Sequence, residues 1–184
     1  MKTFLVFFCA LMFVMFSEGS VLSQTTAGGS AMILKVESSA FKDGDMIPSK
    51  YACEGINVSP PLKWSGGPDG TKSFALIADD PDAPAGTWVH WIVYNIPPSV
   101  KNLAEHVPVS EKLKDGTLQG MNDFRKAGYG GPCPPMGTHR YYFKVYALDT
   151  MLSLGPGATK KQVADAMRGH ILAEGQLMGR YKRN

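Results

Sequence analysis

The chain has 184 residues, a length typical of one domain, and 44% of them are hydrophobic. The charged fraction of 19% is low, and 20 glycines with 13 prolines argue against long heptad helices. Aromatic residues make up 10% of the chain and can supply a core, which argues against disorder. The net charge of +3 attracts anions only weakly, and basic residues cluster only at the C-terminus, so we expect no nucleic-acid partner.

The N-terminal residues predict an export signal. Lys2 precedes an apolar run over Phe4–Phe16, which is too short for a bilayer span of about 20 residues. Small residues then allow cleavage after Gly19 or after Ser23, and the sequence does not decide between these positions. We therefore expect a signal peptide over residues 1–23, a periplasmic or secreted product, and no integral membrane segment in the mature chain. A retained N-terminal anchor is the alternative, because a clean A-x-A motif is missing.

Two cysteines, Cys53 and Cys133, follow the predicted signal peptide. An oxidising compartment favours disulfides, and two thiols allow only one pairing. We expect a Cys53–Cys133 disulfide, with two shielded thiols as the alternative.

The remaining chain predicts a leader and one mostly β domain. Residues 24–31 have the composition of a flexible leader, and residues 32–184 form the expected domain. Short runs rich in aromatic and β-branched residues, separated by turn residues, are typical of strands. The predicted strands are Met32–Val36, Ser73–Asp79, Trp88–Asn95 and Arg140–Leu148.

One helix is expected near the C-terminus. Thr159 and Gln162 have the spacing of a capping box, apolar residues follow at helical spacing, and Gly169 is suited to end the helix. Residues 171–181 are ambiguous between an extension of this helix and a final strand, although Gly175 and Gly179 weaken the helix. The pattern indicates a β-sandwich or barrel with at least one late helix.

Two of the four histidines are candidates for binding. His90 lies inside a predicted strand, where a structural, hydrogen-bonded histidine is the simplest interpretation. His139 leaves a loop dense in glycine and proline, which is better placed to meet a ligand. His106 and His170 have the pattern of surface or helix-end residues, and we expect no role for them.

Three acidic residues, Asp79, Asp80 and Asp82, lie where the predicted strand Ser73–Asp79 ends. Such a group can bind a metal or form an Asp-Pro turn in which a carboxylate accepts backbone N–H groups, and it does not match the calcium-loop pattern. The nucleophile elbow of α/β-hydrolases, the phosphate-binding loop, the dinucleotide fingerprint and the H-E-x-x-H motif are missing. We expect no metal and no cofactor.

Several motifs occur in an order that resembles the phosphatidylethanolamine-binding protein family, which includes the Raf kinase inhibitor proteins. They are Asp80-Pro-Asp-Ala-Pro84, His90-Trp-Ile-Val-Tyr-Asn95, Gly131-Pro132 and Gly137-Thr-His-Arg-Tyr141. The resemblance covers about residues 32–181, and other segments look like the bacterial and archaeal branch of the family.

This resemblance implies an antiparallel β-sandwich with one or a few short helices and a small pocket at one end. It also implies that the helix stops near Gly169 and that residues 171–181 return as a strand. In the family the pocket accepts phosphate-like anions and phospholipid head groups. By matching motifs, its expected residues are Asp80, Asp82, Ala83, Pro84, Trp88, His90, Gly131, Pro132, His139 and Tyr141.

The expected function is therefore that of an exported, non-enzymatic protein that binds a small anion or a phospholipid head group. One alternative is a protein-interaction or inhibitor module that acts on a protease or a kinase. Another is a hydrolase that uses Asp80, His90 and His139 with a metal or an activated water. The sequence does not identify the physiological ligand, distinguish a whole lipid from a small anion, name a protein partner or fix the oligomeric state.

Overall fold

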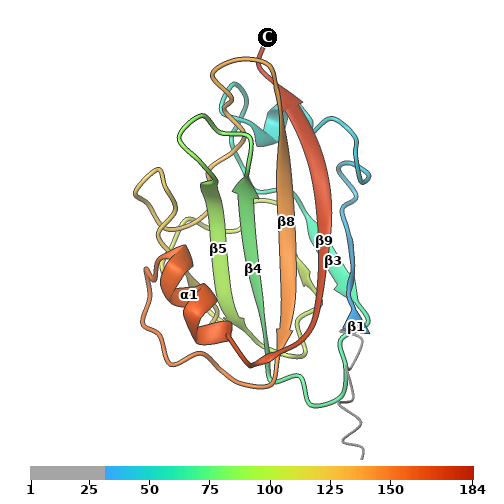
Figure 1. Ribbon diagram of the computed structural model, residues 1–184, viewed down its shortest axis with the longest axis vertical. Helices are drawn as coiled ribbons and strands as arrows, with labels where there is room; N and C mark the ends of the chain where they lie inside the picture. The colour runs from blue at the N-terminus through green and yellow to red at the C-terminus, as the bar shows by residue number, and fades with distance from the viewer. Residues whose placement is uncertain (1–31) are drawn as a thin grey trace, which may run out of the picture.

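The computed structural model describes residues 32–184 (Figure 1). The predicted signal peptide and leader lie outside the described residues. Within these described residues, eleven elements follow in chain order. They are β1 (Met32–Ile33), β2 (Lys35–Glu37), the 3-10 helix η1 (Ser49–Tyr51), β3 (Leu62–Ser65), β4 (Ser73–Asp80), β5 (Trp88–Ile96), β6 (Asn102–Leu103), β7 (Leu118–Gln119), β8 (Thr138–Leu148), α1 (Lys160–Met167) and β9 (Ile171–Lys182).

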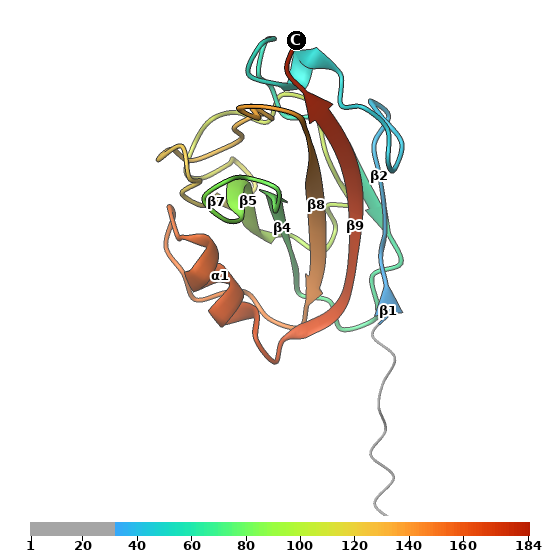
Figure 2. The ribbon, with the colours of Figure 1, turned by 45° about the horizontal axis from the view of Figure 1, so that its top comes forward.

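The strands form two sheets that pack face to face. The large sheet has the order β1-β9-β8-β4-β5-β7, and the small sheet has the order β2-β3-β6. All pairs are antiparallel except β1 with β9. Figure 2 shows α1 on one side of the large sheet and β2 on the other. The predicted mostly β, antiparallel fold class is confirmed.

Two apolar clusters hold these layers together. Residues such as Trp64, Phe74, Trp91 and Phe143 are buried in the cluster that includes both sheets. The second cluster joins α1 to the outer face of the large sheet. All eight residues of β4 are buried, because this strand is covered on both faces. This double burial explains why residues 74–78 form a continuous apolar run instead of alternating with polar residues.

The prediction of one strand over Met32–Val36 is wrong. The chain leaves the large sheet at Leu34 and enters the small sheet at Lys35, so β1 pairs with β9 and β2 pairs with β3. The crossing depends on Gly175 of β9, where a Cβ atom would lie 2.0 Å from the Leu34 carbonyl oxygen. Because the switch is set by this tertiary contact, the local pattern could not reveal it.

The C-terminal elements follow the predictions. The Thr159 side chain accepts from the Gln162 backbone N–H, and the Gln162 side chain accepts from the Thr159 N–H, which completes the capping box. Helix α1 ends at Met167, and residues 171–181 lie within β9, as the resemblance implied. None of the helices in residues 32–184 combines the length and the apolar character that crossing a membrane requires.

Candidate anion-binding site

A cavity of about 240 Å³ lies at one end of the large sheet, where β4 ends and β5 and β8 begin; this end is uppermost in Figure 1. We call it the terminal pocket. Strand β4 lies between β8 and β5, so Asp80 of β4 is flanked by the strands that carry His139 and His90. The lining residues are Asp80, Ala83, Pro84, Trp88, His90, Phe124, Cys133, Pro134, Pro135 and His139.

His90 is fixed by the backbone of the glycine-rich loop. Its Nδ1 lies 2.6 Å from the Gly130 carbonyl oxygen, and the Gly130 N–H donates to the His90 carbonyl oxygen at 2.9 Å. The residue is only 4% exposed. Burial lowers the pKa of His90, and the bond to Gly130 opposes this effect without overcoming it. His90 is therefore an oriented ring that is predominantly neutral in the unliganded protein near pH 7.

His139 is oriented by Asp80. Its Nδ1 lies 2.7 Å from Asp80 Oδ2, and both residues are buried. The other carboxylate oxygen, Asp80 Oδ1, accepts the Asp82 backbone N–H at 2.8 Å. Both oxygens of Asp80 are thus engaged, which suits a residue that positions a histidine.

Asp82 lies outside the cavity lining and anchors one of its walls. Its carboxylate accepts hydrogen bonds from the backbone N–H, Nε and Nη2 of Arg140 at 2.9, 2.9 and 2.6 Å. The Arg140 guanidinium lowers the pKa of Asp82 to about 2. This pairing ties the turn that carries Ala83 and Pro84 to the start of β8.

Gly131, Pro132 and Tyr141 also lie behind the lining. The Gly131 N–H donates to Asn57 Oδ1 at 2.7 Å, and the Pro132 carbonyl accepts the Cys53 N–H at 3.0 Å. Tyr141 is buried, with its ring centroid 5.2 Å from that of His90 and 6.5 Å from that of His139. These residues support the two histidine rings and the loop that holds them.

The expected Cys53–Cys133 disulfide is present, with the two Cα atoms 5.4 Å apart. Cys133 also lines the terminal pocket, so the disulfide is part of the pocket wall. It joins the loop after β7 to the turn that follows η1, across 80 residues of sequence.

Phe124, Pro134 and Pro135 line the pocket and were not predicted. The Phe124 ring centroid lies 5.5 Å from that of Trp88 and 5.3 Å from that of His90. The two prolines belong to the same loop as Cys133, whose composition had indicated a ligand-facing loop. Phe124 belongs to no motif, and a single aromatic residue in a polar loop gives no signal that sequence reasoning can use.

The acidic triad does not form a metal site. The three carboxylates have different partners: Asp79 pairs with lysines, Asp80 with His139 and Asp82 with Arg140. They point in different directions because side chains alternate along β4 and the chain then turns. Over residues 32–184, no group of three or more His, Cys, Asp or Glu side chains is arranged to hold a metal ion.

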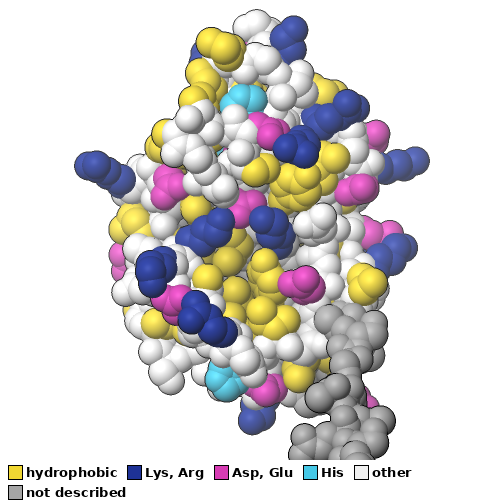
Figure 3. All heavy atoms as spheres, in the orientation of Figure 1, with side chains coloured by type: hydrophobic (Ala, Val, Ile, Leu, Met, Phe, Trp, Pro, Cys, Tyr) yellow, Lys and Arg dark blue, Asp and Glu magenta, His cyan; other side chains and the backbone are white. Residues whose placement is uncertain are grey.

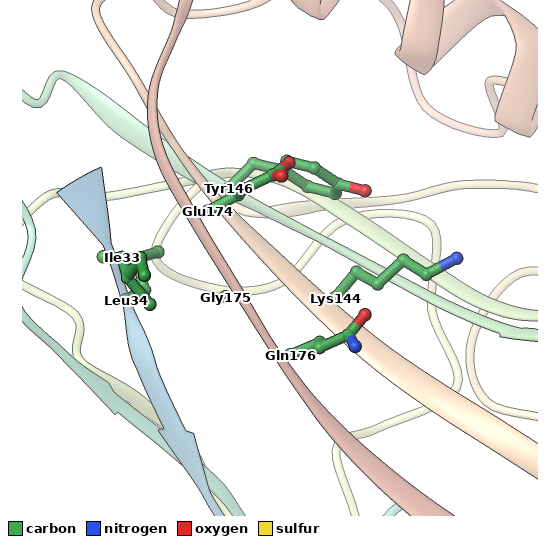
Figure 4. A pocket seen from close by; sticks show the side chains of 7 residues that line it. All are labelled: Ile33, Leu34, Lys144, Tyr146, Glu174, Gly175 and Gln176. Atoms are coloured by element: carbon green, nitrogen blue, oxygen red, sulfur yellow. The ribbon is translucent and has the colours of Figure 1, made fainter. Parts of the chain in front are cut away.

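A larger cavity of about 510 Å³ lies beside β1, β8 and β9, lined by Ile33, Leu34, Lys144, Tyr146, Glu174, Gly175 and Gln176 (Figure 4). Its ammonium group, on Lys144, already pairs with Asp79, which also binds Lys160. Figure 3 shows charged side chains of both signs around apolar ones on this face. Because its ammonium group is already paired, this cavity is a weaker candidate for a ligand-binding site than the terminal pocket, which is lined by buried titratable side chains.

The fold is an antiparallel β-sandwich with a cavity at one end of its large sheet. Residues 37–182 match the family model described as phosphatidylethanolamine-binding protein. The chain belongs to this family, as the motifs had indicated.

Relatives and solved structures agree with this membership. The chain is 53% identical over 150 residues to a UPF0098 protein of Methanothermobacter thermautotrophicus, covering 82% of this chain and 99% of the relative. A UPF0098 protein of Aquifex aeolicus is 50% identical, with 86% and 93% covered. The structure resembles a phosphatidylethanolamine-binding protein homolog from Chlamydia trachomatis, with a TM-score of 0.76, 46% identity, and 83% and 99% covered. It also resembles E. coli YbcL, a member of the mammalian PEBP family, with a TM-score of 0.76, 38% identity, and 82% and 99% covered.

Proposed function

We propose that this protein is an exported, non-enzymatic binding protein whose terminal pocket takes a phosphate-like anion or a phospholipid head group. The observation that carries this proposal is a pair of buried histidines, His90 and His139, that line one cavity from strands on either side of β4. A protonated imidazole donates to an oxyanion, and a ring that is already held at one nitrogen is oriented to do so through the other.

The hydrogen bonds of both rings couple anion binding to protonation. Nδ1 of His90 faces a carbonyl oxygen and Nδ1 of His139 faces a carboxylate oxygen, and both oxygens act as acceptors. Each Nδ1 therefore carries the hydrogen in the neutral ring, and Nε2 donates to an anion only when the ring is protonated. Because the lining contains no lysine or arginine, ring protonation is its source of positive charge.

The lining also favours binding over catalysis. It holds no serine or threonine, and its cysteine, Cys133, is oxidised in the disulfide. A hydroxyl or thiol nucleophile next to a histidine base is therefore missing from the lining, and the Asp80 carboxylate is engaged at both oxygens, by His139 and by the Asp82 N–H. The half-buried disulfide suits an oxidising compartment, which supports the export part of the proposal.

Calorimetric titration of the mature protein with phosphate and phosphoethanolamine tests the proposal. We expect saturable binding to the wild type and a loss of at least about tenfold in affinity in His90→Gln and in His139→Gln, because each removes one charged donor. His170→Gln is the matched control, since His170 is an exposed histidine that pairs with Asp149 away from the terminal pocket.

The coupling to protonation is tested with sulfate, which stays doubly charged between pH 8 and pH 5.5. Sulfate should bind more tightly at pH 5.5 than at pH 8, because a protonated ring can donate to the anion through Nε2. The charge of sulfate does not change over this range, so any pH dependence comes from the protein. No binding of any of these anions to folded protein at pH 5.5 would reject the proposal, and pH-independent sulfate binding would reject the role of the histidines.

A second candidate function is docking on a protein partner, such as a protease met outside the cell. It is favoured by exposed apolar side chains beside the terminal pocket, with Phe124 40% exposed and Met136 78% exposed. A stable complex that forms equally well with wild type and His90→Gln, and that is lost in Met136→Asp, would support this function over anion binding.

A further inference from the structure

The cavity of about 510 Å³ beside β1, β8 and β9 carries groups of opposite charge at different places along its wall. We call it the side cavity. Side chains alternate along a strand, so the β8 and β9 side chains that line it project from the outer face of the large sheet. This is the face on which α1 packs, and Figure 4 shows these side chains extending to the same side of the two strands.

The positive charge comes from two lysines that share one buried carboxylate. The Nζ atom of Lys144 lies 2.8 and 3.1 Å from the two carboxylate oxygens of Asp79, and the Nζ atom of Lys160 lies 2.6 Å from one of them. The Asp79 side chain is 1% exposed, whereas those of Lys144 and Lys160 are 32% and 35% exposed. One carboxylate neutralises only one of two ammonium groups, so this part of the wall keeps an excess positive charge that solvent can reach.

The negative charge comes from Glu174, which is exposed. Among the hydrogen bonds and ion pairs formed within residues 32–184, none involves the side chain of Glu174. In the register of β8 and β9, Lys144 lies opposite Gln176 and Tyr146 lies opposite Glu174. Lys144 and Glu174 are therefore diagonal neighbours, a relation that separates Cα atoms by about 7–8 Å.

Tyr146 and Ile33 supply apolar surface to the same wall. Tyr146 is half-buried and Ile33 is 82% exposed. Burial raises the pKa of Tyr146 to about 12, and the carboxylates of Glu174 and Asp79 add to this effect, so the phenol stays a neutral hydrogen-bond donor near pH 7.

This arrangement of charges favours a ligand that carries both signs. A simple anion is repelled by Glu174, a simple cation is repelled by the lysine pair, and an apolar ligand would remove charged groups from water without pairing them. A ligand with a carboxylate at one end and an ammonium at the other pairs with both parts of the wall. An extended peptide spans about 3.3–3.6 Å per residue, so two residues match the diagonal between Lys144 and Glu174.

We propose that the side cavity binds short peptides with free ends, of the dipeptide class. The C-terminal carboxylate lies at Lys144 and Lys160, the N-terminal ammonium lies at Glu174, and apolar side chains of the peptide cover Tyr146 and Ile33. This site is separate from the terminal pocket, and the proposal does not depend on what that pocket binds.

The test is a titration of the ¹⁵N-labelled protein at pH 7, followed by the NMR shifts of its backbone amides. The probes are the dipeptide Leu-Phe, its N-acetylated form and its C-terminal amide, and at this pH both ends of Leu-Phe are predominantly charged. We expect saturable shifts in β8 and β9 around the side cavity. Each capped peptide should bind at least about threefold more weakly, because it loses one charge pair.

Two variants assign the two ends of the peptide. Glu174→Lys should bind N-acetyl-Leu-Phe at least as tightly as Leu-Phe, because the free ammonium then meets a positive charge. Lys144→Met should weaken the binding of Leu-Phe and reduce its advantage over the C-terminal amide. Glu111→Lys is the matched control, since Glu111 is exposed and lies outside the lining. The amide spectrum of each variant also shows whether it is folded.

Three results would overturn the proposal. One is the absence of shifts around the side cavity with up to about 10 mM Leu-Phe, and another is equal affinity for the free and capped peptides. The third is a preference for the free amino end that persists in Glu174→Lys. Shifts confined to the surroundings of His90 and His139 would place the peptide in the terminal pocket and would also reject the side cavity as its site.

Discussion

Two opposing influences act on the pKa of His90, and their net effect can be measured. Burial lowers its pKa, whereas its hydrogen bond to Gly130 favours the protonated ring, and burial dominates. A buried histidine with a lowered pKa binds a proton less readily in the folded state than in the unfolded state. Its contribution to stability is therefore present above the unfolded pKa of about 6.5 and is lost as the pH falls from there toward the folded value.

We expect the wild-type protein to lose stability between pH 7.5 and pH 5.5, and His90→Gln to lose less, because glutamine does not titrate. Urea unfolding at the two pH values measures this difference, with His170→Gln as the control. Adding sulfate at pH 5.5 should restore part of the wild-type stability, because the anion binds the protonated folded state. An equal loss in wild type and His90→Gln would contradict the role of His90.

At the residue scale, motifs identified part of the candidate site. Asp80, His90 and His139 were found because they belong to ordered motifs, and the structure brings all three to one cavity. Asp82, Gly131, Pro132 and Tyr141 are outside the lining. Asp82 pairs with Arg140, and the backbone of Gly131 and Pro132 bonds to Asn57 and Cys53. Tyr141 lies two residues further along β8 than His139, on the same buried face. Their roles in ligand binding stay predictions, as does the role of every lining residue.

At the scale of elements, the predictable strands were those whose own sequence decides them. Strands β4, β5 and β8 are long and rich in apolar or aromatic residues, so their existence follows from local pattern. Strands β6 and β7 have two residues each and exist only because a neighbouring strand pairs with them. Such short elements carry no periodic signal of their own.

Gly175 makes the crossing of β1 into β2 sensitive to a single methyl group. In Gly175→Ala, the new Cβ would meet the Leu34 carbonyl carbon and oxygen, which are backbone atoms that cannot move aside cheaply. We expect a loss of about 2–3 kcal/mol, or about 5–10 °C in Tm, measured by thermal unfolding. Gly155→Ala, where no neighbouring atom lies within 4 Å of the added Cβ, is the matched control. A Tm equal to that of the control would show that the crossing tolerates the methyl group.

At the scale of the whole molecule, the disulfide connects global stability to the shape of the terminal pocket. Cys53 and Cys133 are 80 residues apart. A loop of that length gives a stabilisation on the order of 4 kcal/mol in the chain-entropy treatment. We expect the Cys53→Ser, Cys133→Ser double variant to unfold at lower urea concentration and to bind phosphate more weakly, because the Cys133 wall loses its covalent tie.

The measurements are urea unfolding and phosphate titration under identical conditions. Wild type treated with a dithiol reductant should behave like the double variant, and reductant should leave the double variant unchanged. Unchanged phosphate affinity in a folded double variant would show that backbone hydrogen bonds alone hold the wall, for example those between Gly130 and His90.

The Cys53–Cys133 bond also closes a covalent ring that contains β3 through β7, while β8, α1 and β9 form a tail outside it. The exposed residues Lys112 and Lys114 lie on this ring, in the hairpin before β7. A protease that cuts there opens the ring without releasing a fragment, because the disulfide still bridges the two pieces. A nicked molecule would therefore migrate as one species on a non-reducing gel and as two on a reducing gel, and it would retain both histidines of the pocket.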